Sequence, residues 1–407
     1  MRVFCLFCLV AVACNGPRSS DSSGPRVRLW HNFNPQETEA LNGALERREG
    51  PAVEITRFPF SRGLTILSQA LAAGTECADL VRIDASWLPA LVEAGLLVAA
   101  PDTVDPRPPR DWLPEAAELA EYAGAIYALP QSLDGLALVH RAGSIDGVAW
   151  PPASVDALLD AATQLAQSSG DSLGVRVDGF WFAAFLRARG GDVLDPATGA
   201  LGIDEPIAAT TLAEFGAMFG PGGPAPSLPP AGGEERDEIR QFRNGTVKIA
   251  LTGPWAAHDL GNGTTDGLLV APFPRSASGR PAAPRGGQLF AVPACAGDAR
   301  AGWALARDLT APRLQADWGH RFGIIPTTRD GLDRAGELSQ SFYRAVQAGR
   351  PLPRHPLTPE MFDDLTPAIA AVVAGDATPQ EALAGVARAW TRLLSRHGIA
   401  ARRPPSP

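Results

Sequence analysis

The sequence predicts an α/β fold, and three observations lead to this prediction. Segments with strand-like and helix-like patterns alternate along residues 27–97. The chain has 407 residues, which is enough for two domains, or one large one, with a proper core. Its composition, 45% hydrophobic and 20% charged, is ordinary for a soluble globular protein. Strands that alternate with helices favour a parallel sheet covered on both faces, so we expect such a sheet near the N-terminal end.

The elements of this first part have recognisable starts and ends. Short strands are predicted at 27–30, 52–58 and 78–84. The predicted helix at 35–49 starts with a proline, and the one at 63–74 ends at a glycine. A further helix is predicted at 86–97.

The pattern changes after residue 120. Two apolar segments within 124–142 are separated by a polar kink at 131–135, and the Pro/Gly-rich stretch 220–233 must be a loop. A strand over 246–251 ends on a Gly-Pro-Trp turn, and another is predicted at 286–294. Helices are expected at 154–168, 179–189, 205–219, 234–245, 298–310, 312–321, 338–348, 359–374 and 379–397, before a disordered tail at 399–407.

The N-terminus has the features of an export signal. A single positive charge at Arg2 precedes an apolar run that is too short to span a bilayer, which predicts a signal peptide over 1–13. Small residues before Cys14 resemble a bacterial lipobox, and residues 14–25 are polar, so we expect a lipidated Cys14 followed by a flexible tether. An ordinary cleaved signal peptide is the alternative. No other run is long enough for a transmembrane helix.

Charge and motifs exclude several classes of function. The net charge of −8 and the lack of a basic patch argue against nucleic acid. No two histidines have metal-ligand spacing, so no metal or cofactor is expected. No catalytic motif is recognisable, which argues against an enzyme. A secreted glycoside hydrolase stays as an alternative, because such chemistry needs only two carboxylates, for example Asp363 and Asp364.

Several motifs occur in the order of a known family. They are "VRLWHNF", "ADLVRIDASWLPALVEAGLL", "GAIYALPQSLDGLALVHRA", "WPPASVDALLDAATQL", "FRNGTVKIALTGPW", "GGQLFAVPA" and "GIIPTTRD". Together they resemble the extracytoplasmic solute-binding proteins of ABC importers, in the carbohydrate-binding group that includes maltose-binding protein. The chain departs from the family pattern at Val139 and His140, and at Ser154 and Val155.

The resemblance implies a two-lobed periplasmic-binding-protein fold of type II, in which each lobe is a mainly parallel sheet flanked by helices. The first lobe would comprise 26–133 and 288–330, and the second 136–286 and 332–398. Ligand would bind in a cleft between the lobes and close them by a hinge motion. The family topology also implies a disulfide between Cys77 and Cys295, an even pair in an oxidising compartment.

The resemblance further implies a set of ligand-binding residues. Trp255, on the Gly-Pro-Trp turn, would pack its flat ring against the apolar face of a sugar, although a core role is the alternative. Asp84 could instead cap the following helix, Trp87 could pack that helix, and Asn32 and Asn34 could be plain turn residues. The complete set is Asn32, Asn34, Asp84, Ser86, Trp87, Gln131, Asp134, Phe180, Trp181, Trp255, Gly286, Gly287 and Phe362.

The implied function is that of a lipid-anchored, monomeric binding component that captures an oligosaccharide outside the cytoplasm and passes it to a membrane permease. The same fold could bind a polyamine, a ferric ion or glycerol phosphate, or could act as a sensor subunit. Iron would need more tyrosines than the three in the chain.

Overall fold

The computed structural model describes residues 26–75, 77–101, 111–170, 172–194, 200–225 and 237–398. The predicted signal peptide, Cys14, the predicted tether and the tail at 399–407 therefore lie outside the described residues, as does much of the predicted loop at 220–233. Within the described ranges, no helix is long and apolar enough to cross a membrane.

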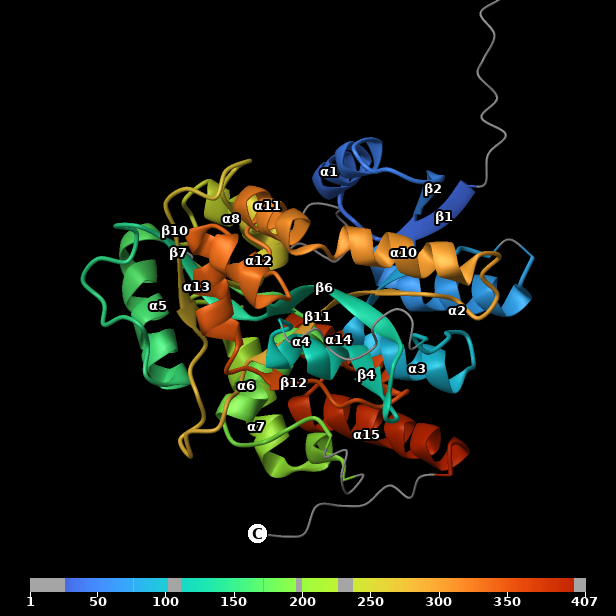
Figure 1. Ribbon diagram of the computed structural model, residues 1–407. Coiled ribbons are helices and arrows are strands. Elements are labelled where there is room, and N and C mark those ends of the chain that lie inside the picture. The colour runs from blue at the N-terminus through green and yellow to red at the C-terminus, as the bar shows by residue number, and fades with distance from the viewer. Residues whose placement is uncertain are drawn as a thin grey trace, which may run out of the picture.

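The first sheet has six strands, in the order β12-β11-β3-β1-β2, with β6 also paired to β11 (Figure 1). Strands β1, β2 and β3 run parallel, and β11 runs antiparallel to both β3 and β6. The strands are β1 (Arg26–His31), β2 (Ala52–Arg57), β3 (Leu80–Asp84), β6 (Ala128–Gly135), β11 (Pro284–Ala291) and β12 (Arg350–Pro351). The β-α-β-α-β alternation at the N-terminal end thus produces the parallel part of this sheet.

Local signals determine where the first helices begin and end. Asn34 and Glu37 form a capping box at the start of α1 (Pro35–Glu46). Gly74 ends α2 (Gly63–Ala73) in the left-handed conformation, with φ 65°. Helix α10 (Ala299–Leu309) and α1 lie over one face of the sheet, where Leu29, Leu80 and Phe290 are buried with residues of both helices.

The second sheet has four strands, in the order β10-β7-β9-β8. They are β7 (Ala137–Arg141), β8 (Leu173–Gly174), β9 (Ile249–Thr252) and β10 (Leu268–Pro272). Strand β7 runs antiparallel to both of its neighbours, whereas β8 and β9 run parallel, so this sheet is mixed rather than mainly parallel as expected. Strands β6 and β7 follow each other in the chain but belong to different sheets, with Leu136 between them. The polar residues 131–135, expected to be a kink, therefore lie inside strand β6.

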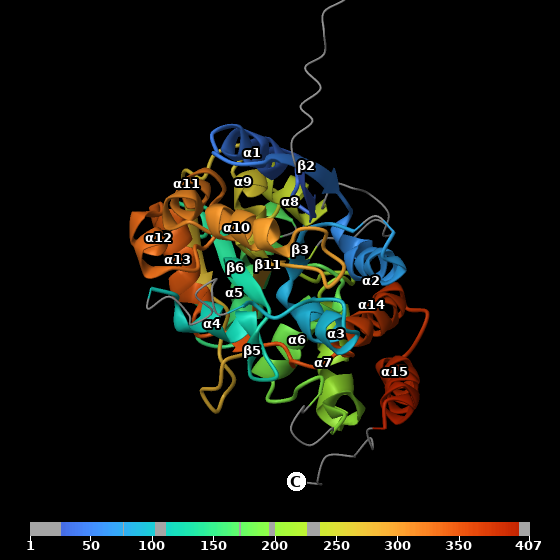
Figure 2. The same ribbon diagram turned by 45° about the vertical axis from the view of Figure 1, so that its right-hand side comes forward.

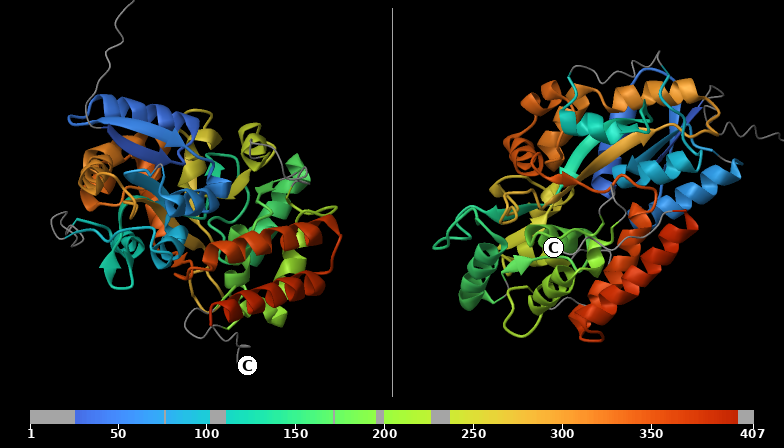
Figure 3. Two further views of the ribbon diagram at one scale, coloured as in Figure 1. Left: turned by 90° about the vertical axis from the view of Figure 1, so that its right-hand side faces the viewer. Right: turned by 90° about the horizontal axis from the view of Figure 1, so that it is seen from below.

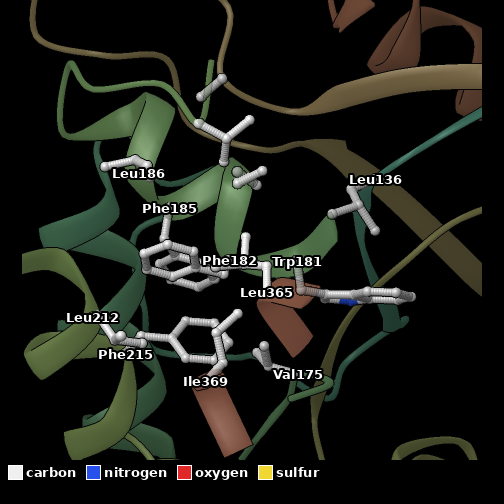
Figure 4. Packing of buried hydrophobic residues seen from close by; sticks show 14 of the residues in the cluster. Leu136, Val175, Trp181, Phe182, Phe185, Leu186, Leu212, Phe215, Leu365 and Ile369 are labelled. Atoms are coloured by element: carbon white, nitrogen blue, oxygen red, sulfur yellow. The ribbon is translucent and has the colours of Figure 1, made fainter. Parts of the chain in front are cut away.

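Helices from two distant parts of the chain cover the second lobe. Helices α6 (Gly179–Ala188) and α7 (Pro206–Ala217) pack against α14 (Thr358–Ala374) and α15 (Pro379–Arg396) (Figure 3). Phe182, Phe185 and Phe215 form the aromatic centre of this core, with Leu365 and Ile369 of α14 beside them (Figure 4). Helix α5 (Val155–Ser169) begins at the Ser154 cap.

Further elements complete the two lobes. They are η1 (Phe60–Arg62), η2 (Ala85–Trp87), α3 (Leu88–Glu93), α4 (Pro114–Ala120), β4 (Glu121–Tyr122), β5 (Ala125–Ile126), η4 (Gly202–Asp204), α8 (Asp237–Arg243), η5 (Pro254–Ala256), α9 (Ala257–Leu260), α11 (Pro312–Phe322), α12 (Arg329–Arg334) and α13 (Glu337–Val346). The turned view in Figure 2 places α11, α12 and α13 together on one side of the molecule. The sequence did not predict α4, α12 or β10, and β9 begins only at Ile249 rather than at residue 246.

A disulfide joins Cys77, just before β3, to Cys295, just after β11. Because β3 and β11 are neighbours in the first sheet, the two residues come close, with their Cα atoms 5.8 Å apart across 218 residues of sequence. The α/β fold with two lobes is as expected, and the exact lobe boundaries stay a prediction.

Candidate ligand-binding site

Polar residues gather on one face of the first sheet, toward the carboxyl ends of β1, β3 and β6. Strand register places them there: Gln288 pairs with Asp84 on one side and with Ser132 on the other. The remainder of this face is apolar and is covered by α1 and α10. We call the following set the polar patch: Asn32, Arg82, Asp84, Gln131, Ser132, Asp134 and Gln288.

A β-bulge brings Gln131 into this patch. Pro130 pairs with Leu289 and Ser132 pairs with Gln288, so Gln131 is an extra residue in strand β6. A bulge turns the local backbone and redirects a side chain. Here the Gln131 side chain meets the guanidinium of Arg82, and its Oε1 accepts hydrogen bonds from Arg82 Nε at 3.1 Å and from Nη2 at 3.0 Å.

Arg82 is the charged centre of the patch and is only 6% exposed. Its Nη1 donates to Asn32 Oδ1, and its guanidinium carbon lies 4.0 Å from the centre of the Phe33 ring. Burial lowers its pKa to about 10, and the nearby carboxyls of Glu37, Asp134 and Asp84 oppose this shift. The guanidinium therefore remains charged at neutral pH.

Two carboxyl groups lie near this cation without a direct ion pair to it among the described residues. Asp84 Oδ2 accepts from Gln288 Nε2 at 2.8 Å, and its Oδ1 accepts from the backbone and the hydroxyl of Ser86. Burial raises the pKa of Asp84. Burial and the charge of Asp84 together raise the pKa of Asp134 to about 8. Near neutral pH the Asp134 carboxyl therefore carries a proton and can donate as well as accept hydrogen bonds.

Gly286 leaves space for the Asp134 side chain. It pairs with Asp134 across the sheet, and a Cβ at this position would lie 3.0 Å from Asp134 Oδ1. Gly286 is half-buried, so its backbone stays accessible beside the carboxyl.

The second lobe contributes a group of aromatic side chains. The rings of Phe180, Trp181 and Trp255 contact one another edge to face, with centroids 5.7 to 6.3 Å apart. Phe362 lies against Gly179, where a Cβ would be 3.0 Å from its Cδ1. We call Phe180, Trp181, Trp255 and Phe362 the aromatic cluster. Their elements reach the first lobe: η5 lies against β6, and α14 lies against η2.

The Gly-Pro-Trp turn determines the position of the Trp255 ring. A Cβ at Gly253 would lie 2.1 Å from Cζ3 of that ring, so only glycine allows the ring to fold back over the turn. Trp255 packs against the cores of both lobes and stays half-buried. This packing fits the alternative core role, and contact of the Trp255 ring with a sugar stays a prediction.

A second aromatic pair belongs to the first lobe. The rings of Trp87 and Phe60 lie 5.2 Å apart at an angle of 35°. Trp87 is buried and lies against Gly63, where a Cβ would be 2.3 Å from Cη2 of the indole. Phe60 is 52% exposed.

The structure brings most of the expected residues into these two groups. Asn32, Asp84, Gln131 and Asp134 are in the polar patch, Gly286 is next to it, and Phe180, Trp181, Trp255 and Phe362 form the aromatic cluster. Their contact with a ligand remains a prediction.

Other predicted residues have visible structural roles. The Asn34 side chain caps α1, and Ser86 donates to the Asp84 cap. Trp181 donates its indole N–H to the carbonyl of Leu251 at 2.6 Å, and its ring lies near Leu136, apart from the Phe182 and Phe185 rings (Figure 4). Gly287 allows close packing, because a Cβ there would lie 2.4 Å from the carbonyl oxygen of Ser132.

Sequence reasoning missed Arg82, Ser132 and Gln288 of the polar patch, and Phe60 beside Trp87. Arg82 and Gln288 each place a polar side chain inside an apolar strand, in "DLVRID" and "GGQLFAV". A polar residue in a buried strand needs a partner, and this signal could have identified both. Phe60 follows a proline after a predicted strand, and nothing in its neighbourhood distinguishes it from an ordinary loop residue.

Two other features of the chain lack the groups of a binding site. In the described part of the chain, no three His, Cys, Asp or Glu side chains come together as a metal site requires. A small hollow is lined by Val193, Leu194, Pro353, Thr358, Met361, Phe362 and Trp390. Its lining is almost entirely apolar, so it lacks the polar groups that orient a hydrophilic ligand.

The chain is similar to several known proteins. Residues 43–340 match a family described as bacterial extracellular solute-binding protein. The maltotriose-binding protein of Pyrococcus abyssi (strain GE5 / Orsay) is 25% identical over 352 residues, covering 83% of this chain and 75% of the relative.

Solved structures resemble the whole two-lobed fold. The GacH receptor of Streptomyces glaucescens GLA.O, solved unliganded and with acarbose and an acarbose homologue, has a TM-score of 0.82 at 24% identity, covering 91% of this chain and 98% of the receptor. UgpB from Mycobacterium tuberculosis, in complex with glycerophosphocholine, has a TM-score of 0.78 at 17% identity, covering 92% of this chain and all of that chain (100%).

Proposed function

This chain belongs to the bacterial extracellular solute-binding protein family, and from that premise we propose that it binds an oligosaccharide between its two lobes. The observation that carries the proposal is the polar patch of the first sheet with the aromatic cluster of the second lobe beside it. A sugar ring has an apolar C–H face and a rim of hydroxyls, and the two groups suit these two surfaces.

Each residue has a role in this proposal. Trp255, Phe180 and Phe362 contact the C–H faces of the sugar rings. Asn32, Gln131, Gln288 and Asp134 form hydrogen bonds with hydroxyl groups, and Asp84 orients Gln288. Gly286 allows the sugar to approach the backbone. Asn34, Ser86, Trp87, Trp181 and Gly287 hold the surrounding elements in place.

The two lobes close around the ligand in this proposal. The hinge lies where the chain passes between the predicted lobes, near residues 133–136, 286–288 and 330–332. The closed protein then delivers the sugar to the permease of an ABC importer. The chain works as a monomer and has no catalytic role.

The N-terminal segment supports export and anchoring. Residues 1–13 direct the chain out of the cytoplasm, Cys14 becomes lipidated, and residues 14–25 tether the protein to the membrane. Growth of an expressing bacterium with a labelled fatty acid tests this step. Label should enter the intact protein and be absent from a Cys14→Ala variant, and equal labelling of the two would contradict lipidation at Cys14.

One alternative ligand class has specific support, because a structure with the same fold holds glycerophosphocholine. A phosphodiester needs free cationic donors. At the polar patch, Arg82 already directs its Nε, Nη1 and Nη2 to two amide oxygens. This arrangement favours a neutral, hydroxyl-rich ligand over a phosphodiester.

Thermal unfolding with different ligands tests the proposed ligand class. Maltotriose, glycerophosphocholine and spermidine would each be added to the full chain purified in mild detergent. A ligand at a hundred times its Kd adds about 2.7 kcal/mol to the free energy of unfolding. Stabilisation by maltotriose alone supports the proposal. Stabilisation only by one of the other two ligands would replace the sugar with that class.

A further inference from the structure

The hydrogen bonds of Arg82 determine the orientation of two amide side chains. A guanidinium group carries N–H donors and no acceptor. Its bonds must therefore end on the oxygen atoms of Asn32 and Gln131, as the structure has them. The two NH₂ groups consequently point away from Arg82.

Gln288, across the polar patch, leaves an acceptor rather than a donor without a partner. Gln288 donates its Nε2 to Asp84 Oδ2, which leaves its Oε1 facing elsewhere. Among the described residues, this Oε1 and Asn32 Nδ2 are both buried and have no hydrogen-bond partner. Gln288 is only 8% exposed. An unpartnered buried polar atom is costly, so both atoms favour a ligand that satisfies them.

Arg82 is itself held in place firmly. It is almost fully buried and lies over the Phe33 ring. It also donates hydrogen bonds to Gln131 in strand β6 and to Asn32, which follows strand β1. In the described residues, no carboxylate lies within ion-pair distance of the guanidinium, and its bonded partners are amides. A buried arginine without a direct carboxylate partner is unusual and suggests a role beyond packing.

We propose that Arg82 is a positioning residue that fixes the hydrogen-bonding polarity of the sugar site. By holding both amide oxygens, it makes Asn32 and Gln131 donors to the lone pairs of one ligand hydroxyl group. Gln288 Oε1 accepts the proton of a neighbouring hydroxyl. This inference rests on the proposed oligosaccharide function and names the atoms through which the sugar is recognised.

The test is a double-mutant cycle with maltotriose as the probe, measured by calorimetric titration of the full chain in mild detergent. Asn32→Asp keeps the shape of the side chain and an oxygen for Arg82, but it replaces the ligand-facing NH₂ with an acceptor. We expect the affinity for maltotriose to fall at least ten-fold, while Tm stays within roughly 2 °C of the unaltered protein. Asn244→Asp, the same change at an exposed turn, is the control and should alter neither value.

Arg82→Lys supplies the second arm of the cycle. A lysine cannot hold both amides in one plane, so Asn32 becomes free to turn over. In the Arg82→Lys background, the Asn32→Asp change should therefore cost less than about three-fold in affinity. Equal costs in both backgrounds would show that Arg82 does not set the orientation of Asn32, and would overturn the inference.

Two further outcomes separate this inference from the proposed function. Unchanged maltotriose affinity in Asn32→Asp would overturn the inference and leave the proposed function intact. If the unaltered chain does not bind maltotriose, the proposed function is wrong. The part of the inference that concerns a sugar hydroxyl is then wrong as well. In that case, a large fall in the Tm of Asn32→Asp would also contradict the predicted bond from Arg82 to an oxygen at position 32.

Discussion

The raised pKa of Asp134 predicts that this carboxyl group makes the free energy of unfolding depend on pH. Burial and the charge of Asp84 raise its pKa from 3.8 to about 8. The folded protein therefore keeps a proton that the unfolded chain has released. The stability linked to this proton is fully present at low pH and is lost as pH rises through about 8.

The size of the effect follows from the shift. One proton held only by the folded state changes the free energy of unfolding by about 1.36 kcal/mol per pH unit. Between pH 6.5 and pH 8 this amounts to about 2 kcal/mol, and water around the half-buried carboxyl reduces it toward about 1 kcal/mol. Burial lowers the pKa values of His31, His140 and His355 in the folded protein, so these groups act in the opposite direction near pH 6.5, where the unfolded chain loses their protons. Comparison with Asp134→Asn, which keeps all three histidines, isolates the contribution of Asp134.

Urea unfolding from pH 6.5 to pH 9 measures this dependence. Over this range the free energy of unfolding of the unaltered protein should fall by about 1 kcal/mol relative to that of Asp134→Asn, which cannot titrate. Asp146→Asn, a change at an exposed aspartate, should follow the unaltered protein. If Asp134→Asn keeps the full pH dependence, the reasoning about this carboxyl is wrong.

Three further predictions concern backbone positions and the disulfide. Gly253→Ala should displace the Trp255 ring, because the added Cβ would lie 2.1 Å from it, and should weaken maltotriose binding at least ten-fold in a calorimetric titration. Unchanged affinity would mean that this ring does not contact the sugar. Gly43 lies inside α1, and a Cβ there would meet only Arg47 Nη1. Gly43→Ala should therefore raise the free energy of unfolding, measured with urea, by up to about 1 kcal/mol. A lower free energy of unfolding would show that the helix has no room for this methyl group. Replacing Cys77 and Cys295 together by serine removes a crosslink between positions 218 residues apart. The free energy of unfolding, measured with urea, should fall by about 2–5 kcal/mol. An unchanged value would show that the disulfide does not stabilise the fold.

Much of the fold could be predicted because its signals are local. The capping box of Asn34 and Glu37, the proline at position 35 and the glycine at position 74 each determine the end of a helix within a few residues. The alternation of strands and helices along 27–97 depends only on hydrophobic periodicity. These features need no knowledge of distant parts of the chain.

The missed features depend on contacts between distant residues. Residues 131–135 read as a polar kink because their partners, Arg82 and residues 286–288, are far away in sequence. Gln131 enters the patch only through a bulge opposite β11, and a bulge is visible only when both strands are in register. Arg82 and Gln288 could therefore be noticed as polar interruptions, but their partners could not be named.

The site predictions depended on the family resemblance more than on residue chemistry. The resemblance proposed Trp255 and Asp134, and the structure places them on elements that lie side by side, η5 and β6. It also proposed Asn34 and Trp181, whose polar groups are already engaged in a helix cap and in a bond to the Leu251 carbonyl. A motif shows which segment carries a site, and only the folded contacts show which atoms remain free.

The central claim is that residues from both lobes bind one oligosaccharide, and calorimetric titration of maltotriose into the full chain tests it most directly. The titration would be repeated with Gln288→Ala from the first lobe, Trp255→Ala from the second, and Leu269→Ala, an exposed apolar residue of β10, as a control. We predict one molecule bound per chain, at least ten-fold weaker binding in Gln288→Ala and in Trp255→Ala, and unchanged binding in Leu269→Ala. Binding that survives either of the first two substitutions unchanged would contradict a site shared between the lobes.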